Sequence, residues 1–241
     1  MTFIVKRLQL ELALKTIPAS IQLIEYNPAH YRLELFSEQQ IKQEKYFSQW
    51  VLARQAQFLA GRIAAKNALQ TISHTPENIT IGKHREPLWP KGIIGSISHS
   101  NHVSIATAQV KTEQTKGCGL DIQTIFNQEE STKVLPIILS QQDQVSFNKH
   151  KNHFYENQLA TLIFSAKESY FKTVFNQVKE YFDFNAVSIQ SIDLQNKQVI
   201  LISNASSPIH HQVILPQITL TVYYDFLVIN GDSHIITYSV Y

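Results

Sequence analysis

The chain has 241 residues, enough for one large domain or two small ones with a sizeable core. The charged fraction of 17% is ordinary for a globular protein. The net charge of only +2 does not suggest a protein that binds nucleic acid through its overall charge. With Cys118 as its single cysteine, the chain can form no intramolecular disulfide, and a cysteine-based zinc site is disfavoured. We find no apolar run of membrane-spanning length and no secretory signal pattern, so we expect a cytoplasmic protein without a membrane partner.

The first half of the chain predicts one long helix among short strands. The helix covers about residues 45–72, where apolar side chains recur at helical spacing and proline is absent. Gly61 inside it suggests close packing or the close approach of another group. Ahead of the helix, Ser37 and Gln40 fit a capping box that opens a shorter helix. Apolar runs predict strands at residues 21–26, 93–97 and 103–110.

Basic side chains gather at three places in this half. Arg54 and Arg62 lie off the apolar stripe of the long helix. Arg85 lies in a basic segment that two prolines hold extended, which is typical of an anion cradle. Ser98 and His99 end a predicted strand; because strand neighbours point to opposite faces, they are not a nucleophile and its base, and phosphate binding is the better interpretation. The alternatives are a solvated helix face and an ordinary surface loop.

The second half supplies two carboxylates on different elements. A Gly-Cys-Gly-Leu-Asp-Ile-Gln run predicts a strand with Asp121 and Gln123 on one face. The glycines before them allow a tight turn or the close approach of a ligand. A helix over about residues 160–179 carries Glu168 and Lys172 one turn apart. The alternatives are a strand with one solvated face and an ordinary exposed ion pair on the helix.

The order of elements predicts an α+β fold. Residues 125–158 are less regular, and we expect one short helix, capped by Ser140, and a mobile loop. Two hairpins follow, the second turned by Asn230-Gly231. Each half then has a small antiparallel sheet and a long helix, which suggests two similar halves. The predicted boundaries are residues 1–113 and 114–241.

Four stretches carry a resemblance to a known family. They are Gly61-Arg62-x-Ala64-Ala65, Arg85-x-Pro87-x-Trp89-Pro90 leading to Ser98-His99, Gly119-Leu-Asp121-Ile-Gln123, and Phe164-Ser-Ala-Lys167-Glu168-Ser-x-Phe-Lys172. In this order they resemble the 4′-phosphopantetheinyl transferases, especially the larger monomeric type that activates siderophore and peptide synthetases, such as the enterobactin-synthase and surfactin-synthetase-activating enzymes. The resemblance implies two α/β halves related by a pseudo-twofold, with coenzyme A in the cleft between them.

The implied reaction moves 4′-phosphopantetheine from coenzyme A to a serine of an apo carrier protein and releases adenosine 3′,5′-bisphosphate. By resemblance, Asp121, Gln123 and Glu168 would hold Mg²⁺, and Glu168 would also act as general base. Lys167 and Lys172 would hold the pyrophosphate. The residues implied for coenzyme A binding are Arg54, Arg62, Arg85, Ser98, His99, Lys167 and Lys172. The implied catalytic residues are Asp121, Glu168 and Lys172.

The carrier is expected to present an acidic helix, and we predict that a basic or apolar surface within residues 137–154 receives it. Gln123 departs from the family, which usually has glutamate there, so we predict weaker metal binding. The main alternative is a non-catalytic homologue that binds coenzyme A or a carrier protein. A second is another metal-dependent phosphoryl or nucleotidyl transferase, although the chain has no Walker-type glycine-rich loop.

Overall fold

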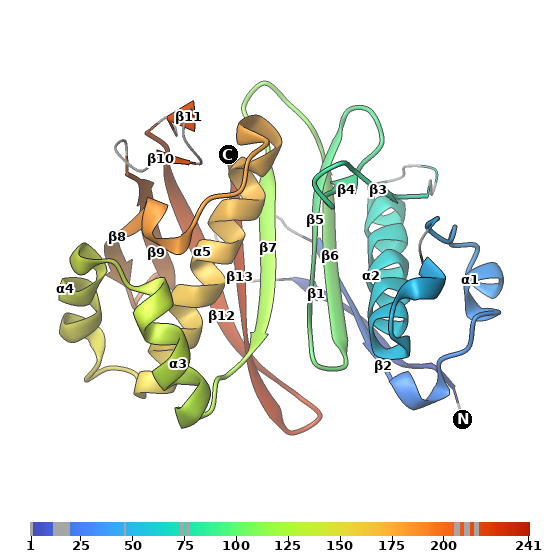
Figure 1. Cartoon of the computed structure of the whole chain (residues 1–241), viewed down its shortest axis with the longest axis horizontal. Helices are drawn as coiled ribbons and strands as arrows, with labels where there is room; N and C mark the ends of the chain where they lie inside the picture. Colours follow the sequence, from blue (N-terminus) through green and yellow to red (C-terminus); the bar gives the residue numbers. More distant parts are fainter. Residues whose placement is uncertain are drawn as a thin grey trace. The chain divides into compact units, whose positions relative to one another are not determined.

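The computed structural model describes residues 2–11, 20–45, 47–72, 75, 78–204, 208–209, 213–214 and 217–241. The chain forms two compact units, Met1–Lys116 and Gly117–Tyr241. Each unit combines a small antiparallel sheet with a long helix, which confirms the α+β class (Figure 1). A pseudo-twofold relation between two halves stays a prediction.

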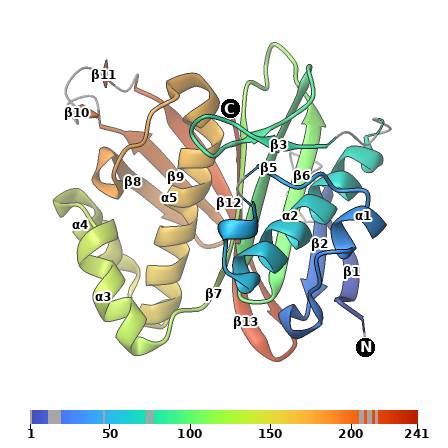
Figure 2. The ribbon, with the colours of Figure 1, turned by 45° about the vertical axis from the view of Figure 1, so that its right-hand side comes forward.

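The sheet of the first unit has the strand order β1-β2-β6-β5, and all its neighbours are antiparallel. Helix α2 (Leu52–Thr71) packs on β2, β5 and β6 (Figure 2). A Cβ added at Gly61 would lie 3.2 Å from Ile97 Cγ2, so the predicted close packing at this glycine is confirmed. The strands are β1 (Ile4–Glu11), β2 (Ser20–Tyr26), β5 (Ile93–Ser100) and β6 (Val103–Val110). The shorter elements are η1 (Pro28–His30), α1 (Leu35–Glu38), η2 (Phe47–Gln49), β3 (Thr80–Ile81) and β4 (Pro87–Leu88).

Two helix starts in this unit differ from the prediction. Ser37 lies inside α1 instead of capping it, and its hydroxyl donates to the backbone oxygen of Glu34 at 2.7 Å. Such a local bond to the preceding turn competes with the N-cap role. The long helix begins at Leu52, because Val51 has an extended backbone. Leu52, one of the apolar side chains at helical spacing that we expect to be buried, is 70% exposed at the helix end.

The sheet of the second unit has the order β7-β13-β12-β9-β8 and is again antiparallel. Helix α5 (Glu156–Val178) packs mainly on β7 and β13. Asn230 and Gly231 both have positive φ, which confirms the predicted turn between the last two strands. The strands of this sheet are β7 (Cys118–Thr124), β8 (Val187–Asp193), β9 (Gln198–Ser203), β12 (Thr219–Ile229) and β13 (Asp232–Val240). The remaining elements are η3 (Phe184–Ala186), β10 (Pro208–Ile209) and β11 (Val213–Ile214).

The region expected to hold one short helix and a mobile loop holds two helices. Ser140 caps α4 (Gln141–His150) as predicted. Helix α3 (Gln128–Ile138) was not predicted, although Asn127 and Glu130 form a capping box at its start. The helix also accommodates Pro136 in its interior, where proline normally ends a helix pattern.

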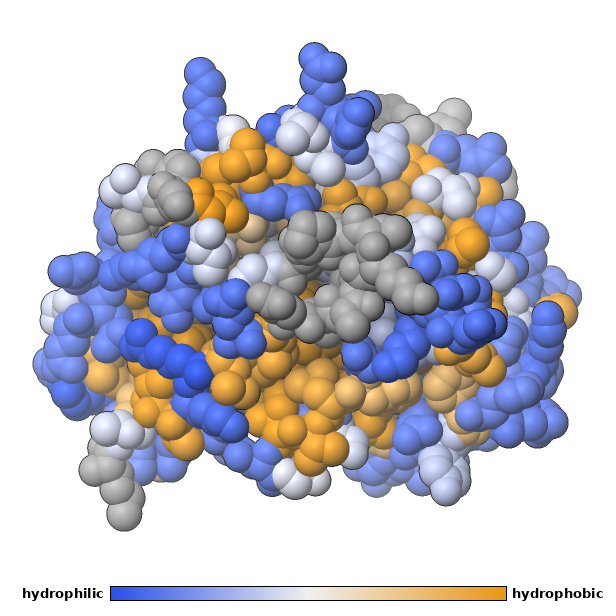
Figure 3. Space-filling view, turned by 180° about the vertical axis from the view of Figure 1, so that it is seen from behind, coloured by the Kyte–Doolittle hydropathy of each residue, from blue (hydrophilic) through white to orange (hydrophobic). Residues whose placement is uncertain are grey.

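Hydrophilic residues cover most of the surface seen in Figure 3, and hydrophobic residues gather in places between them. Among the described residues, no helix has the length and hydropathy that a membrane crossing requires.

Candidate functional site

The close packing of α5 on β7 sets the geometry of the candidate site in the second unit. A Cβ added at Gly119 would collide with the backbone oxygen of Ser169, and one at Gly117 with that of Thr173. The close approach predicted for these glycines is therefore made by the α5 backbone, not by a ligand. Because alternate residues of a strand share a face, Asp121 points toward the same helix as Gly119.

Asp121 is held by polar groups from α5. It is 5% exposed, which rules out the alternative of a solvated strand face. Ser165 Oγ donates to its Oδ2 at 2.7 Å, and Lys172 Nζ lies 2.7 Å from its Oδ1. The cross-strand partner of Asp121 is Thr237, whose hydroxyl lies 2.9 Å from Ser165 Oγ. The hydroxyl network fixes the carboxylate before any ligand arrives.

Glu168 shares the electrostatic environment of Asp121 and Lys172. It is partly buried on α5, one turn before Lys172. Burial raises the pKa of the Glu168 carboxyl above its ordinary value; the positive charge of Lys172 lowers it, and the negative charge of Asp121 raises it. The structure therefore brings together two carboxylates from different elements. Lys172 is not merely the exposed partner of Glu168, because its ammonium pairs with Asp121.

Oxygen donors at this place suit a small divalent cation. Gln123 lies on the same face of β7 as Asp121, and its Nε2 donates to the backbone oxygen of Thr124 at 3.3 Å. Within the described ranges, no group of three or more His, Cys, Asp or Glu side chains could hold a metal. Magnesium commonly uses one or two carboxylates together with phosphate oxygens and water, so Asp121, Glu168 and the Gln123 amide oxygen fit it. The ammonium of Lys172 shows that a cationic group fits beside Asp121.

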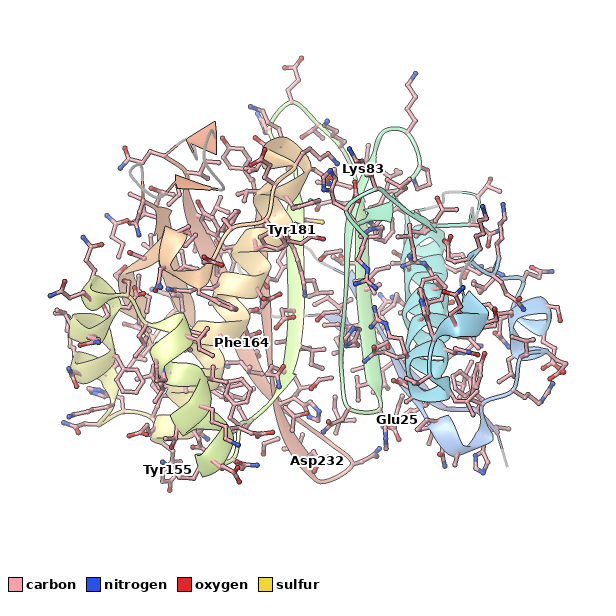
Figure 4. The ribbon with its side chains drawn as sticks, viewed as in Figure 1. Glu25, Lys83, Tyr155, Phe164, Tyr181 and Asp232 are labelled. Carbon is pink, nitrogen blue, oxygen red and sulfur yellow. The ribbon has the colours of Figure 1, made fainter. Side chains whose placement is uncertain are left out.

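A cavity of about 250 Å³ adjoins Glu168. Its walls are largely aromatic, and the rings of Phe171 and Tyr181 stack with their centroids 5.7 Å apart. Figure 4 shows Tyr181 toward the C-terminal end of α5 and Phe164 lower along the same helix. The residues that line the cavity are Lys167, Glu168, Phe171, Tyr181, Phe182, Asp183, Phe184 and Val187.

Lys167 precedes Glu168 in the chain, yet its ammonium is engaged inside the protein. Its side chain is 1% exposed, and Nζ lies 2.7 Å from Asp143 Oδ2. Nζ also donates to the backbone oxygens of Ile138 at 2.7 Å and Phe184 at 3.0 Å. Burial lowers the pKa of Lys167, whereas the charge of Asp143 raises it. An ammonium has three donors, so contact with a pyrophosphate would require Lys167 to leave these acceptors.

The first unit contains a second cavity, of about 140 Å³, with a positive lining. Arg54 and Arg62 reach it from α2, Arg85 from the turn between β3 and β4, and His99 from β5. Ser98 is buried and is not among the lining residues, because it faces the opposite side of β5 from His99. The lining consists of Trp50, Arg54, Gln57, Phe58, Gly61, Arg62, Ile81, Arg85, Pro87, Ile97 and His99.

Arg62 is the most deeply buried cation of this cavity. It is 8% exposed, and its guanidinium carbon lies 4.4 Å from the centroid of the Phe58 ring. Its Nε has no hydrogen-bond partner in the part of the chain that the structure describes. Burial lowers the pKa of Arg62 to about 10, the charge of Glu44 raises it and that of Arg54 lowers it. A buried donor without a partner costs free energy, so this cavity favours an anionic ligand.

Among the described residues, the two other arginines likewise form no ion pair with a carboxylate. Burial and then the charge of Arg85 lower the pKa of Arg54. Arg85 itself has φ of +66°, which is uncommon for a residue with a side chain. The carboxylate of neighbouring Glu86 accepts from the backbone of His84 at 2.9 Å, within the same turn. No ion pair found among the described residues includes Arg54, Arg62 or Arg85.

Two functional candidates were not predicted from the sequence. Gln57 Nε2 lies 2.9 Å from His99 Nδ1, and Arg54 Nη1 lies 3.2 Å from His99 Nε2. The signal for Gln57 is its position three residues after Arg54, on one face of the helix. Asp143 was not predicted as a site residue, and its ion pair with Lys167 spans 24 residues without a local signal.

Comparisons with known proteins agree with this site. The family model for the 4′-phosphopantetheinyl transferase N-terminal domain matches residues 42–109, and that for the 4′-phosphopantetheinyl transferase superfamily matches residues 117–237. The second match contains both Asp121 and Glu168. The resemblance seen in the sequence motifs is therefore confirmed.

Similar proteins include several that bear the name enterobactin synthase component D. The protein from Salmonella typhi is 38% identical over 126 residues, which are 52% of this chain and 50% of that protein. The one from Salmonella typhimurium is 36% identical over 141 residues, 58% of this chain and 56% of the relative. The chain thus spans about half the length of these two relatives. The Escherichia coli O157:H7 protein is 30% identical over 200 residues, 80% of this chain and 88% of the relative.

Proposed function

The chain belongs to the 4′-phosphopantetheinyl transferase superfamily, and from that premise we propose that it transfers 4′-phosphopantetheine from coenzyme A to a serine of an apo carrier protein, with Mg²⁺. The observation that carries the proposal is the packing of α5 on β7. It gives Asp121, Glu168 and Lys172 one electrostatic environment, with an ammonium 2.7 Å from a carboxylate oxygen. Enterobactin synthase component D, the name of several relatives, supports a role in siderophore or other nonribosomal peptide synthesis.

The side chains of the second unit suit the chemistry of this transfer. The acceptor serine oxygen attacks the β-phosphorus of coenzyme A, and the bond from that phosphorus to the departing nucleotide oxygen breaks. Glu168 takes the serine proton as general base, a role that a carboxyl of raised pKa performs well. Lys172 exchanges Asp121 for the pyrophosphate oxygens and stabilises the charge on the departing nucleotide. Mg²⁺ held by Asp121 and Glu168, with Gln123 beside them, would neutralise the pyrophosphate.

The positive cavity of the first unit suits the 3′-phosphate of the coenzyme. Arg54, Arg62 and Arg85 line it without any ion pair among the described residues, and a phosphate group would supply the missing counter-charge. His99 and Gln57 add donors at the same cavity. Ser98 faces away from the cavity, so we assign the phosphate contacts to the other four predicted residues.

The aromatic cavity of the second unit suits the pantetheine arm. The arm is neutral and largely apolar, and it begins at the pyrophosphate. Glu168 lines this cavity together with Phe171, Tyr181 and Phe184. The arm would lie on these rings, while its two amides hydrogen-bond at the polar edge.

We further propose that the carrier docks on α3 and α4 of a monomeric enzyme. Ile137 is 60% and Val145 73% exposed there, and Lys149 and Lys151 are exposed at the end of α4. An acidic carrier helix would find both charge complementarity and apolar contacts on this surface. The pathway, the monomeric state and a cytoplasmic location belong to this proposal.

Intact-mass measurement of an apo carrier domain tests the function. We expect the carrier to gain one phosphopantetheine group after incubation with the protein, coenzyme A and Mg²⁺. Peptidyl, aryl and acyl carriers should be tried in parallel, because the chain alone does not select among them. An unchanged mass for every carrier would contradict the proposal and favour the non-catalytic alternative, which the amide of Gln123 at a metal position motivates.

A further inference from the structure

The ammonium of Lys167 joins three segments of the second unit at one point. Its acceptors are the side chain of Asp143 on α4, the backbone oxygen of Ile138 at the end of α3, and that of Phe184 in η3. The Lys167 and Asp143 side chains are 1% and 0% exposed. All these distances are between 2.7 and 3.0 Å, so the ammonium is fully used inside the protein.

Asp143 extends the connection on the other side. Its Oδ1 accepts from the backbone nitrogen of Ile189 on β8 at 2.6 Å. Its Oδ2 accepts from the backbone nitrogen of Ser140 at 2.9 Å and from the Ser140 hydroxyl at 2.8 Å. Both carboxylate oxygens are therefore satisfied, and the pair links α3, α4, η3 and β8 to α5. Buried ion pairs are tolerated when their remaining lone pairs and protons find partners, as here.

The connected segments border the place where Glu168 works. Glu168 follows Lys167 directly on α5, and Phe184 and Val187 line the cavity beside it. Ile138 ends α3 and Asp143 lies on α4, and these two helices carry the surface proposed for the carrier. One ion pair thus fixes three parts of the second unit relative to one another: helix α5, which carries Glu168, the cavity wall at Phe184, and helices α3 and α4.

We propose that Lys167 is a positioning residue, not a pyrophosphate contact, and that its pair with Asp143 couples helices α3 and α4 to Glu168. This inference rests on the proposed function and deepens it. It assigns a role to Asp143, and it makes carrier use depend on both residues more strongly than coenzyme A affinity, to which the charged phosphate groups contribute most. Lys172, in contrast, can contact the pyrophosphate, because its side chain is 23% exposed and its ammonium pairs with Asp121 at the site itself.

A double-mutant cycle tests the coupling. The variants are Lys167→Met, Asp143→Asn and the double variant. The double variant removes both charges, so no single charge is left buried and misfolding for that reason is avoided. Transfer is measured at varied carrier concentration, and coenzyme A binding is measured by calorimetry in EDTA. Lys172→Met, five residues further along the same helix, is the comparison for a pyrophosphate contact.

We expect each single variant to lose about tenfold or more in kcat/KM for the carrier, because small misplacements of a catalytic group are costly. Its Kd for coenzyme A should stay within about twofold of wild type, whereas Lys172→Met should raise that Kd about tenfold. The kcat/KM of the double variant should be no lower than that of the less active single variant. The inference would be overturned if the losses in kcat/KM of the two single variants multiply in the double variant. It would also be overturned if the Kd for coenzyme A rises as much for Lys167→Met as for Lys172→Met. Either result would leave the proposed function standing. A wild-type protein that binds coenzyme A but modifies no carrier would overturn the proposed function and this inference with it.

Discussion

The two candidate sites of this chain treat charge in opposite ways. In the first unit, three arginines line one cavity, and Arg62 is buried with an Nε that lacks a partner among the described residues. In the second unit, the buried charges are paired: Asp121 with Lys172, and Asp143 with Lys167. The first site needs an anion to complete it. In the second, Asp121 already has a counter-charge in Lys172, and under the proposed function the substrate takes Lys172 over.

This difference separates binding from chemistry. Phosphate binding to a cavity with uncompensated positive charge is favourable. Folding has already removed the arginines from water, so binding does not add the cost of their desolvation. A paired carboxylate and ammonium are fixed in place, and fixed groups lose little when charge develops on a reacting phosphate. Under the proposed function, we therefore expect the first unit to supply most of the affinity for the coenzyme and the second unit to supply the catalytic groups.

The largest effect should follow from removing either carboxylate. Glu168→Gln and Asp121→Asn should each lower the transfer rate by about a thousandfold or more, because a general base and a charged metal ligand are lost. Coenzyme A affinity in EDTA should not fall, since each change removes a negative charge and leaves the cations that bind the anionic coenzyme in place. Asp225→Asn is the control, because Asp225 forms an ion pair with Lys197 on the second unit's surface. Transfer near the wild-type rate in both site variants would refute the metal-site assignment.

Stability should also distinguish the paired site from the unpaired one. Lys167→Met should lower the free energy of unfolding by about 3–5 kcal/mol, because Asp143 is left buried and unpaired. Arg62→Met should change it by no more than about 1 kcal/mol, because its charge has no ion-pair partner among the described residues and methionine can still pack on Phe58. Urea denaturation followed by circular dichroism measures both. Equal losses would show that the two sites do not differ in this way.

Affinity for coenzyme A should fall when Arg62 is replaced. Arg62→Met should raise the Kd by about ten- to a hundredfold, the range expected when a charge-assisted hydrogen bond is lost. Lys66→Met is the matched control, one turn further along α2, where Lys66 donates to the backbone oxygen of Gln39 at 2.9 Å. Calorimetry should find that the control binds as wild type does. The same rise in both variants would point to a general effect of charge, not to a phosphate site.

The smallest effect should come from Gln123→Glu. A third carboxylate should lower the Mg²⁺ concentration for half-maximal transfer by about three- to tenfold, because ligand charge strengthens the binding of a hard cation. A titration of transfer rate against Mg²⁺ measures this. If the requirement stays the same or rises, then Gln123 is not what limits metal binding here.

Much of this arrangement follows from local sequence patterns, and the rest depends on long-range contacts. The sequence predicts coenzyme A binding by Arg54, Arg62, Arg85 and His99, and these four side chains line one cavity. Ser98 does not line this cavity, because side chains alternate between the faces of β5 and this strand continues to Ser100. The orientation of a side chain on an element is thus readable when the element's bounds are right.

What the sequence does not encode locally is which distant group a buried charge meets. Lys167 and Lys172 are both lysines of one motif on one helix, yet one pairs with Asp143 and the other with Asp121. The difference arises from which elements cover each face of α5. Helix α3 was missed although it has a local start signal, the capping box of Asn127 and Glu130.

The measurement that tests the central claim most directly is the affinity of the wild-type protein for coenzyme A and for dephospho-coenzyme A, by calorimetry in EDTA. If the arginine cavity of the first unit selects the coenzyme by its 3′-phosphate, coenzyme A should bind at least about tenfold more tightly than the ligand that lacks this group. Equal affinity for the two ligands would contradict the account, because the uncompensated charge around Arg62 would then have no part in recognising the substrate.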